Sequence, residues 1–166
     1  METGVGGGHP ALPIAFTAVA SFTFTREIAA PAETVFEVLT DHRGYAALTP
    51  LRKSVLEREG EPAPNGVGAI RKLTAVGPAL REEVIAYEAP SRFSYTLLSG
   101  LPVRDHVGTV ELTPNGGGTK MVYAVKTQPT VPVVGAVVVA AVKQGVKGLI
   151  GGVVAESERR ASAANG

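Results

Sequence analysis

The sequence has no cysteine among its 166 residues. This absence excludes a disulfide framework, a thiolate metal site and a cysteine nucleophile. It is also compatible with the reducing cytoplasm, where we expect this protein to reside. An excess of charge of one sign is lacking as well, because 16 basic and 15 acidic residues nearly cancel and form no basic stripe. The chain therefore lacks the positive field that nucleic-acid binding requires.

The short motifs of several catalytic and cofactor-binding classes are missing too. There is no Gly-x-Ser-x-Gly elbow, no phosphate-binding glycine-rich loop and no His-Glu-x-x-His pair. His9, His42 and His106 are too dispersed to suggest a metal site. We expect no metal and no cofactor, and the sequence offers no nucleophile–base pair for covalent catalysis.

Long hydrophobic runs are scarce. Residues 131–142 are almost wholly apolar, but Lys143 ends this run after 12 residues, short of the ~20 that a spanning helix needs. We expect no transmembrane span, while peripheral membrane contact stays open. Residues 11–20 are also mostly apolar, and Ala18-Val19-Ala20 resembles a cleavage site, but no Lys or Arg precedes them. We expect residues 1–20 to form a flexible tail, with a signal peptide as the alternative.

The rest of the chain is a regular series of strand-like segments. Alternating aromatic and β-branched residues predict a strand over residues 21–28. Pro31 then opens a short amphipathic helix that ends near Thr40, and residues 41–48 predict a second short helix or turn. Six further strands are predicted over residues 51–59, 67–76, 79–87, 92–99, 104–113 and 119–128. The Gly- and Pro-rich turns between them are short, which forces neighbouring strands to run antiparallel.

The last segment, residues 131–160, predicts one long helix because it contains no breaker stronger than glycine. At about 100° per residue, one face carries small and apolar residues, namely Val134, Val138, Ala141, Gly145, Gly148 and Gly152. Lys143, Lys147 and Val154 fall on the opposite face, so we expect the small-residue face to meet the sheet. Such a face serves either close packing or the volume of a cavity. Residues 161–166 are expected to be disordered.

This order of elements resembles the helix-grip fold of the SRPBCC superfamily, which includes START domains and the birch-pollen allergen. Local motifs are similar as well. Residues 28–36 have the sequence I-A-A-P-A-E-T-V-F, like the family's I-x-A-P-x-x-x-V-F/W. Glu83 with residues 87–93 resembles its E-x-x-x-Y-E-P-P-x-R stretch, and residues 117–121 resemble its G-G-T-x-V turn. The bacterial polyketide cyclase/dehydrase-like branch is the most similar.

The resemblance implies a single α+β ligand-binding domain over residues 21–160. In this domain a seven-stranded curved antiparallel sheet wraps around the long C-terminal helix, with two short helices after the first strand. The resemblance also implies a cavity between sheet and helix, which in this superfamily holds lipids, polyketides or other apolar molecules. Some members catalyse cyclisation or dehydration there and others only carry ligands, so the fold leaves the function open.

Side chains that share a face with apolar residues are the candidates for lining such a cavity. The predicted ligand contacts are Tyr95, His106, Tyr123, Phe93, Val138, Ala141, Gly145 and Gly148. The catalytic candidates among them are His106, Tyr95 and Tyr123, because histidine exchanges protons near neutral pH and tyrosine can donate a hydrogen bond to a carbonyl. Each has a plain structural alternative, as a core tyrosine with a satisfied hydroxyl or a histidine at a strand end.

Charged residues supply further candidates. Arg71 and Glu83 lie on neighbouring predicted strands and form either a buried ion pair or, more simply, an exposed cross-strand pair. Arg104 and Asp105 begin the fifth strand of the meander. His42 follows the first helix, and we expect it at the surface near the mouth of the cavity.

Three functions remain open at this point. The leading hypothesis is binding or transport of a small hydrophobic molecule by a carrier or sensor, acting as a monomer or homodimer. The second is an enzyme of the polyketide cyclase, aromatase or dehydratase type. The third is a protein- or membrane-interaction module that uses the apolar last helix. An enzyme needs at least two convergent titratable groups, whereas an apolar cavity with one hydroxyl favours a carrier.

Overall fold

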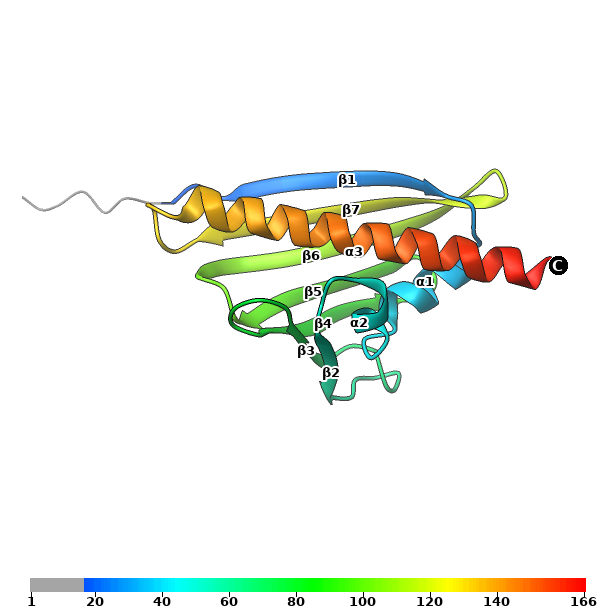
Figure 1. Cartoon of the computed structure of the whole chain (residues 1–166), viewed down its shortest axis with the longest axis horizontal. Helices are drawn as coiled ribbons and strands as arrows, with labels where there is room; N and C mark the ends of the chain where they lie inside the picture. Colours follow the sequence, from blue (N-terminus) through cyan, green and yellow to red (C-terminus); the bar gives the residue numbers. More distant parts are fainter. Residues whose placement is uncertain (1–16) are drawn as a thin grey trace, which may run out of the picture.

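The computed structural model describes residues 17–166, which form a curved seven-stranded sheet and three helices (Figure 1). Along the chain the elements are β1 Ala20–Ile28, α1 Ala32–Thr40, α2 Tyr45–Leu48, β2 Lys53–Arg58, β3 Ile70–Thr74, β4 Leu80–Glu88, β5 Arg92–Ser99, β6 Val103–Asn115, β7 Gly118–Pro129 and α3 Gly135–Ala164. Most of the predicted N-terminal tail, and of the alternative signal segment, lies outside the described residues.

The sheet has the strand order β1-β7-β6-β5-β4-β3-β2, and every neighbouring pair is antiparallel. Successive strands from β2 to β7 pair with one another, as antiparallel strands joined by short connections do. β1 adds the last edge by pairing with β7, from Ala20 against Thr127 to Ile28 against Thr119. The predicted meander and the expected seven-stranded antiparallel sheet are confirmed.

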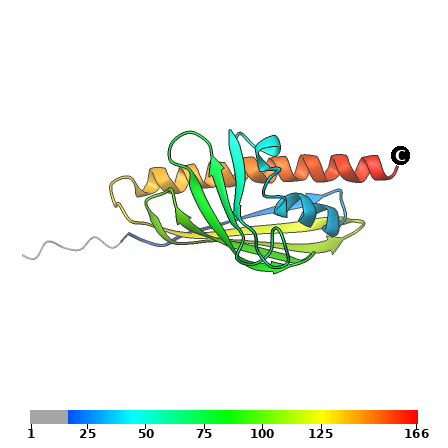
Figure 2. The same cartoon turned by 90° about the horizontal axis from the view of Figure 1, so that it is seen from below.

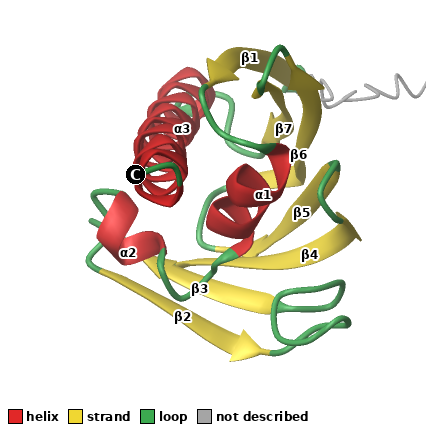
Figure 3. Ribbon diagram, turned by 90° about the vertical axis from the view of Figure 1, so that its right-hand side faces the viewer, coloured by secondary structure: helices red, strands yellow, loops and turns green. Residues whose placement is uncertain are grey.

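The three described helices lie on the concave face of the sheet (Figures 2 and 3). α3 runs along β1 and β7, while α1 and α2 sit beside its C-terminal half. Pro31 precedes α1 directly, where its fixed φ suits a helix start and its missing N–H costs no hydrogen bond. This is the helix-grip arrangement expected from the sequence.

The hydrophobic core fills one end of the space beneath α3. Val35 and Phe36 of α1 and Ile150 and Val153 of α3 pack there with inward-facing strand residues such as Val110. Burying a side chain of this size contributes about 1.5–3 kcal/mol, so this end anchors the helix to the sheet. The space beneath the N-terminal turns of α3 holds neither α1 nor α2 (Figure 2).

α3 begins and ends later than predicted. It starts at Gly135 because Pro132 lies in a turn, where its carbonyl accepts a hydrogen bond from the Gly135 N–H. It continues to Ala164, so residues 161–164 are helical rather than disordered, as suits their alanine content. Within residues 17–166, α3 is the one helix long and apolar enough to cross a membrane. Its C-terminal half packs into the core through Ile150 and Val153.

The rotation of α3 also differs from the prediction. The face that packs on the sheet consists of larger residues, including Val146 and Val153, rather than the small-residue face. Ala141 and Gly145 each precede a valine of this buried face by one residue, which is about 100° around the helix. The larger side chains are turned inward because they remove more apolar surface from water. Val154, expected outside, is half-buried against the core.

Candidate functional site

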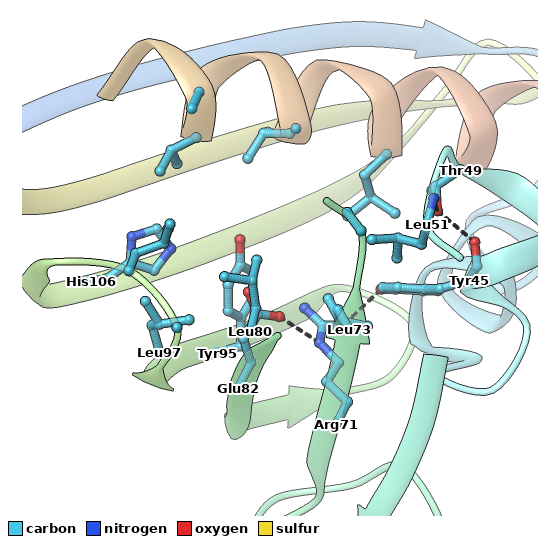
Figure 4. A pocket seen from close by; sticks show the side chains of 18 of the residues that line it. Tyr45, Thr49, Leu51, Arg71, Leu73, Leu80, Glu82, Tyr95, Leu97 and His106 are labelled. Carbon is cyan, nitrogen blue, oxygen red and sulfur yellow. Dashed lines mark hydrogen bonds and ion pairs between the residues drawn. The ribbon is translucent and has the colours of Figure 1, made fainter. Parts of the chain in front are cut away.

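A cavity with a volume of about 290 Å³ lies between the N-terminal half of α3 and the inner face of the sheet (Figure 4). Residues of the β3–β4 turn, the β5–β6 turn and the segment after α2 also line it, and with α3 they frame its mouth. Its apolar walls include Leu51, Leu73, Leu80, Leu97, Val142, Val146 and Leu149. Its polar lining consists of Tyr45, Thr49, Arg71, Glu82, Tyr95, His106 and Tyr123.

The floor of the cavity is built around the guanidinium of Arg71, which is 1% exposed. Arg71 Nε donates a hydrogen bond of 2.7 Å to Glu82 Oε2 on the neighbouring strand. Nη1 donates to the Tyr45 hydroxyl at 2.8 Å, and the guanidinium carbon lies 4.7 Å from the centre of the Tyr95 ring. Nη2 has no hydrogen-bond acceptor among residues 17–166 and points into the cavity (Figure 4). The ion pair therefore leaves one donor group for a ligand.

His42 lies behind this ion pair and is fully buried. Its Nδ1 is 3.3 Å from Arg71 Nη1, a donor, which assigns the imidazole proton to Nε2. Burial, together with the charge of Arg71, lowers the pKa of His42 to about 2, so the ring stays neutral. The predicted surface position near the cavity mouth is wrong, because the ring packs between Tyr45 and Phe93.

Tyr95 and Tyr123 form a hydroxyl pair on the cavity wall, with their oxygens 2.8 Å apart. Burial raises the pKa of both hydroxyls, so both are protonated at neutral pH. One proton is used between them, and the other can be donated to a ligand. Gly108 on β6 makes room for this pair, because a Cβ there would stand 2.4 Å from the Tyr95 ring. Any larger residue at position 108 would displace that ring.

His106 lies at one end of the cavity, Tyr45 and Thr49 lie at the other, and Arg71 lies between them (Figure 4). Its Nδ1 is 3.1 Å from the Thr127 hydroxyl oxygen, and its ring centre is 6.0 Å from that of Tyr95. Burial lowers the pKa of His106, so the imidazole is neutral at neutral pH. When Nδ1 donates its hydrogen to Thr127, Nε2 becomes a proton acceptor for a group in the cavity.

The cavity includes some of the predicted ligand contacts and leaves others outside. Those that line it are Tyr95, His106, Tyr123, Ala141 and Gly145. Phe93 lies behind Arg71, with its ring centre 5.5 Å from the guanidinium carbon. Val138 and Gly148 fall outside because α3 is rotated from its predicted orientation, and Gly148 faces Pro50 instead. Whether the lining residues bind a ligand stays a prediction.

The ion pair in the cavity floor differs from the predicted one by a single residue. Arg71 pairs with Glu82, whereas Glu83 pairs with Arg58 at the surface at 2.6 Å. Since side chains alternate along a strand, this difference moves the pair from the surface to the interior. β4 is irregular between residues 81 and 82 and again between 84 and 86, which breaks the simple alternation. The sequence signal for a buried Arg71 is Leu73, because residues two apart on a strand share a face and Leu73 is apolar.

Other polar candidates do not enter the cavity. Arg104 and Asp105 are exposed at the start of β6. Tyr45 is the lining residue that sequence reasoning missed most plainly, because a four-residue helix such as α2 shows no periodic face. Among residues 17–166, no three histidine or carboxylate side chains converge as metal ligands.

A curved antiparallel sheet that grips a long helix over a mainly apolar cavity defines the helix-grip class of proteins. Within that class, this chain belongs to the polyketide cyclase/dehydrase and lipid transport family, whose model matches residues 19–160. The predicted membership of the SRPBCC superfamily, in its polyketide cyclase-like branch, is confirmed.

Solved structures of three relatives share this fold. The Zhui aromatase/cyclase from Streptomyces sp. R1128 is 22% identical, with 90% of this chain and 99% of that chain covered and a TM-score of 0.76. A START superfamily protein from Mycobacterium smegmatis is 16% identical, with 84% and 97% covered and a TM-score of 0.71. Ara h 8.0201 is 19% identical, with 83% and 97% covered and a TM-score of 0.67. Such low identities show the fold alone, and no curated protein matches the chain.

Proposed function

We propose that the protein binds a small, neutral, largely apolar molecule that carries a carbonyl or hydroxyl oxygen. The observation that supports this most directly is the cavity of about 290 Å³, with its apolar walls and its donors on the floor. Ligand pockets of about 300–1,000 Å³ typically combine apolar walls with a few placed polar groups. The volume is at the lower end of that range, which favours a compact ligand.

The ion pair in the floor favours a neutral ligand over an anionic one. Glu82 already neutralises Arg71 at 2.7 Å. A ligand carboxylate beside them would leave a net negative charge buried without a counter-ion, which is costly. A ketone, ester or phenol can accept a hydrogen bond from Arg71 Nη2 or from the Tyr95–Tyr123 pair without adding charge. We therefore expect neutral oxygen-bearing ligands to bind more tightly than fatty acids.

Two probes that share one ring system test this proposal. Acetylnaphthalene carries a neutral ketone and naphthoate carries a carboxylate, and titration calorimetry would measure both. We expect acetylnaphthalene to bind the wild-type protein more tightly. Native mass spectrometry of the protein from its own host would show whether a ligand is retained. Failure of both probes to bind, with no retained ligand, would overturn the proposal.

A matched pair of variants tests whether the probe binds in the cavity. Gly145 lines the cavity and a Cβ there meets nothing within 4 Å, so we expect the side chain of Gly145→Leu to narrow the cavity. Gly151 on the same helix is equally open but lies outside the cavity. Both changes should favour the helix by up to about 1 kcal/mol. We expect Gly145→Leu to weaken acetylnaphthalene binding by about tenfold or more, and Gly151→Leu to leave it unchanged.

A second candidate function is proton-transfer catalysis on the bound molecule, as in a cyclase or dehydratase. The observation that favours it is the convergence of neutral His106 with Tyr95, Tyr123 and Arg71 in one cavity. His106 Nε2 can accept a proton from the carbon beside a carbonyl, while Arg71 or a tyrosine hydroxyl stabilises the oxygen anion. The cavity therefore meets the requirement for at least two convergent titratable groups. One structural relative is an aromatase/cyclase by name.

Hydrogen exchange on the same probe separates binding from catalysis. In heavy water the methyl protons beside the carbonyl of acetylnaphthalene are replaced by deuterium through an enolate. We expect the wild-type protein to accelerate this exchange and His106→Gln to abolish the acceleration while binding is retained. Exchange no faster than in buffer would eliminate the catalytic candidate and leave the binding proposal in place.

A further inference from the structure

Exposed apolar side chains are concentrated at one end of the molecule. Among residues 17–166, nine large apolar side chains are exposed, and seven of these lie on segments at the end of the molecule where α3 begins. We call these seven the apolar rim: Val19, Val76, Leu98, Val131, Val133, Val134 and Val137. Val133 is 92% exposed, Val76 87% and Val137 69%. The other two lie elsewhere, Val67 in the connection between β2 and β3 and Ile85 on β4.

The segments that carry the apolar rim are held together at that end, on the left in Figure 1. The Thr130 N–H donates to the Pro102 carbonyl at 2.8 Å, which joins the segment before α3 to the β5–β6 turn. The Gln128 amide donates to the Thr17 carbonyl at 2.6 Å, which places the chain before β1 beside them. Val76 also lines the cavity. The rim therefore lies at the end of the molecule that carries the cavity-lining β3–β4 and β5–β6 turns.

Basic side chains lie near the apolar rim, and acidic side chains lie at the opposite end of the molecule. Arg104 precedes the bulged part of β6 near the mouth, and Lys143 and Lys147 lie exposed on the N-terminal half of α3. None of these three forms a salt bridge within residues 17–166. The carboxylates of Glu27 and Glu158 lie at the opposite end, beside the β6–β7 turn. Lysines without a salt bridge also lie elsewhere, for example Lys72 and Lys120, and the exposed Asp105 stands beside Arg104. The three cations outnumber that carboxylate, so the apolar end fits an anionic surface.

We propose that the apolar rim docks the cavity mouth onto a membrane that contains anionic lipids. The aliphatic tips enter the interface between headgroups and acyl chains, while Arg104, Lys143 and Lys147 approach the anionic headgroups. In this orientation the cavity opens toward the bilayer, where small apolar molecules are dissolved.

Features of the rim favour a bilayer over a protein partner. Protein interfaces are anchored by tryptophan, tyrosine and arginine packed into pockets, whereas the rim consists of valines and one leucine. Its members lie on turns, on strand ends and on the first turn of α3 rather than on one strand or one helix face. A bilayer accepts such a surface because it requires no matching shape. The proposal does not depend on which ligand the cavity holds.

Vesicle co-sedimentation tests the apolar part of the proposal. The full chain is mixed with vesicles of phosphatidylcholine, with or without a quarter of phosphatidylglycerol. We expect binding to the anionic vesicles that weakens with added salt. The double change Val133→Ser with Val137→Ser should reduce the partition coefficient by about tenfold or more. Its control, Val67→Ser with Ile85→Ser, removes two exposed apolar side chains away from the rim and should leave binding unchanged.

A second pair of variants tests the charge. Lys143→Glu with Lys147→Glu should weaken binding to anionic vesicles by about fivefold for each residue. Lys72→Glu with Lys120→Glu makes the same change in net charge at exposed positions elsewhere and should have little effect. Circular dichroism and acetylnaphthalene binding would establish that all variants are folded.

Three results would overturn the proposal. The first is a wild-type protein that binds neither kind of vesicle at low salt. The second is an equal loss of binding in the rim variants and in their controls. The third is a wild-type dimer, detected by analytical ultracentrifugation, that becomes monomeric when Val133 and Val137 are changed to serine. That outcome would assign the rim to a second copy of this chain.

Discussion

Replacing Glu82 by glutamine should leave the Arg71 guanidinium buried without its counter-ion. The two side chains are 1% and 7% exposed and are joined at 2.7 Å, so solvent screens the pair little. Removing one partner of such a buried pair costs about 3–5 kcal/mol. Since a domain of this kind is stable by about 5–15 kcal/mol, the expected loss is a large fraction of the total.

Equilibrium unfolding in urea would measure this loss, and the next residue along β4 provides the control. Glu83 pairs with Arg58 at 2.6 Å, but both are substantially exposed, so Glu83→Gln should cost less than about 1 kcal/mol. The double change Arg71→Met with Glu82→Leu removes both charges and should recover most of the stability, because apolar residues can replace a buried ion pair at little cost.

The same variant should reverse the preference of the cavity between the two probes. With Gln at position 82, the uncompensated charge of Arg71 favours naphthoate over acetylnaphthalene. An unfolding free energy of Glu82→Gln within about 1 kcal/mol of the wild-type value would refute the reasoning, since it would mean that water in the cavity solvates Arg71. An unchanged probe preference would separately refute the role of Glu82 in ligand selection.

Two further predictions concern packing and pH. A Cβ at Gly152 would stand 1.9 Å from the Leu48 carbonyl oxygen, so Gly152→Ala should destabilise the protein by about 1–3 kcal/mol. Gly151→Ala should instead stabilise it by up to ~1 kcal/mol. Equal unfolding free energies of the two variants in urea would contradict this close approach. Burial and Arg71 lower the pKa of His42 from 6.5 to about 2, so the unfolded chain takes up a proton first and stability falls as pH falls below 6.5. The loss should be about 2 kcal/mol by pH 5, and His42→Gln should remove most of it; an unfolding free energy that is constant from pH 7 to pH 5 would rule out the neutral buried histidine.

The strand topology could be predicted because local signals decide it. Gly- and Pro-rich turns divide the chain after residue 50 into short alternating segments, and each short turn returns the chain beside the strand it has just left. β5 begins and ends at the predicted residues, and the other strands differ from prediction by a few residues at their ends. Tyr95 and Tyr123 share a face with apolar neighbours, which is why they were identified as lining candidates. Cytoplasmic location and the choice between monomer and homodimer stay predictions.

The partners within the site could not be predicted in the same way. Arg71 meets Glu82 rather than Glu83 because these two residues stand directly opposite each other in the β3–β4 register, and a difference of one residue exchanges the inner and outer faces of a strand. His42 enters the interior because the connection between α1 and α2 turns toward the sheet, and no periodic pattern marks such a connection.

The order of elements and the antiparallel sheet could be read from the sequence alone, since these depend on local periodicity and turn residues, and the family could be recognised from the resemblance of its motifs. The tertiary structure alone decided the rotation of α3, the buried pair of Arg71 with Glu82, and the apolar rim at the end of the molecule where α3 begins. The rotation of α3 depends on which side chains bury the most area against the sheet as a whole. The buried area depends on residues far apart in the chain, so the sequence of α3 alone does not predict how the helix is rotated.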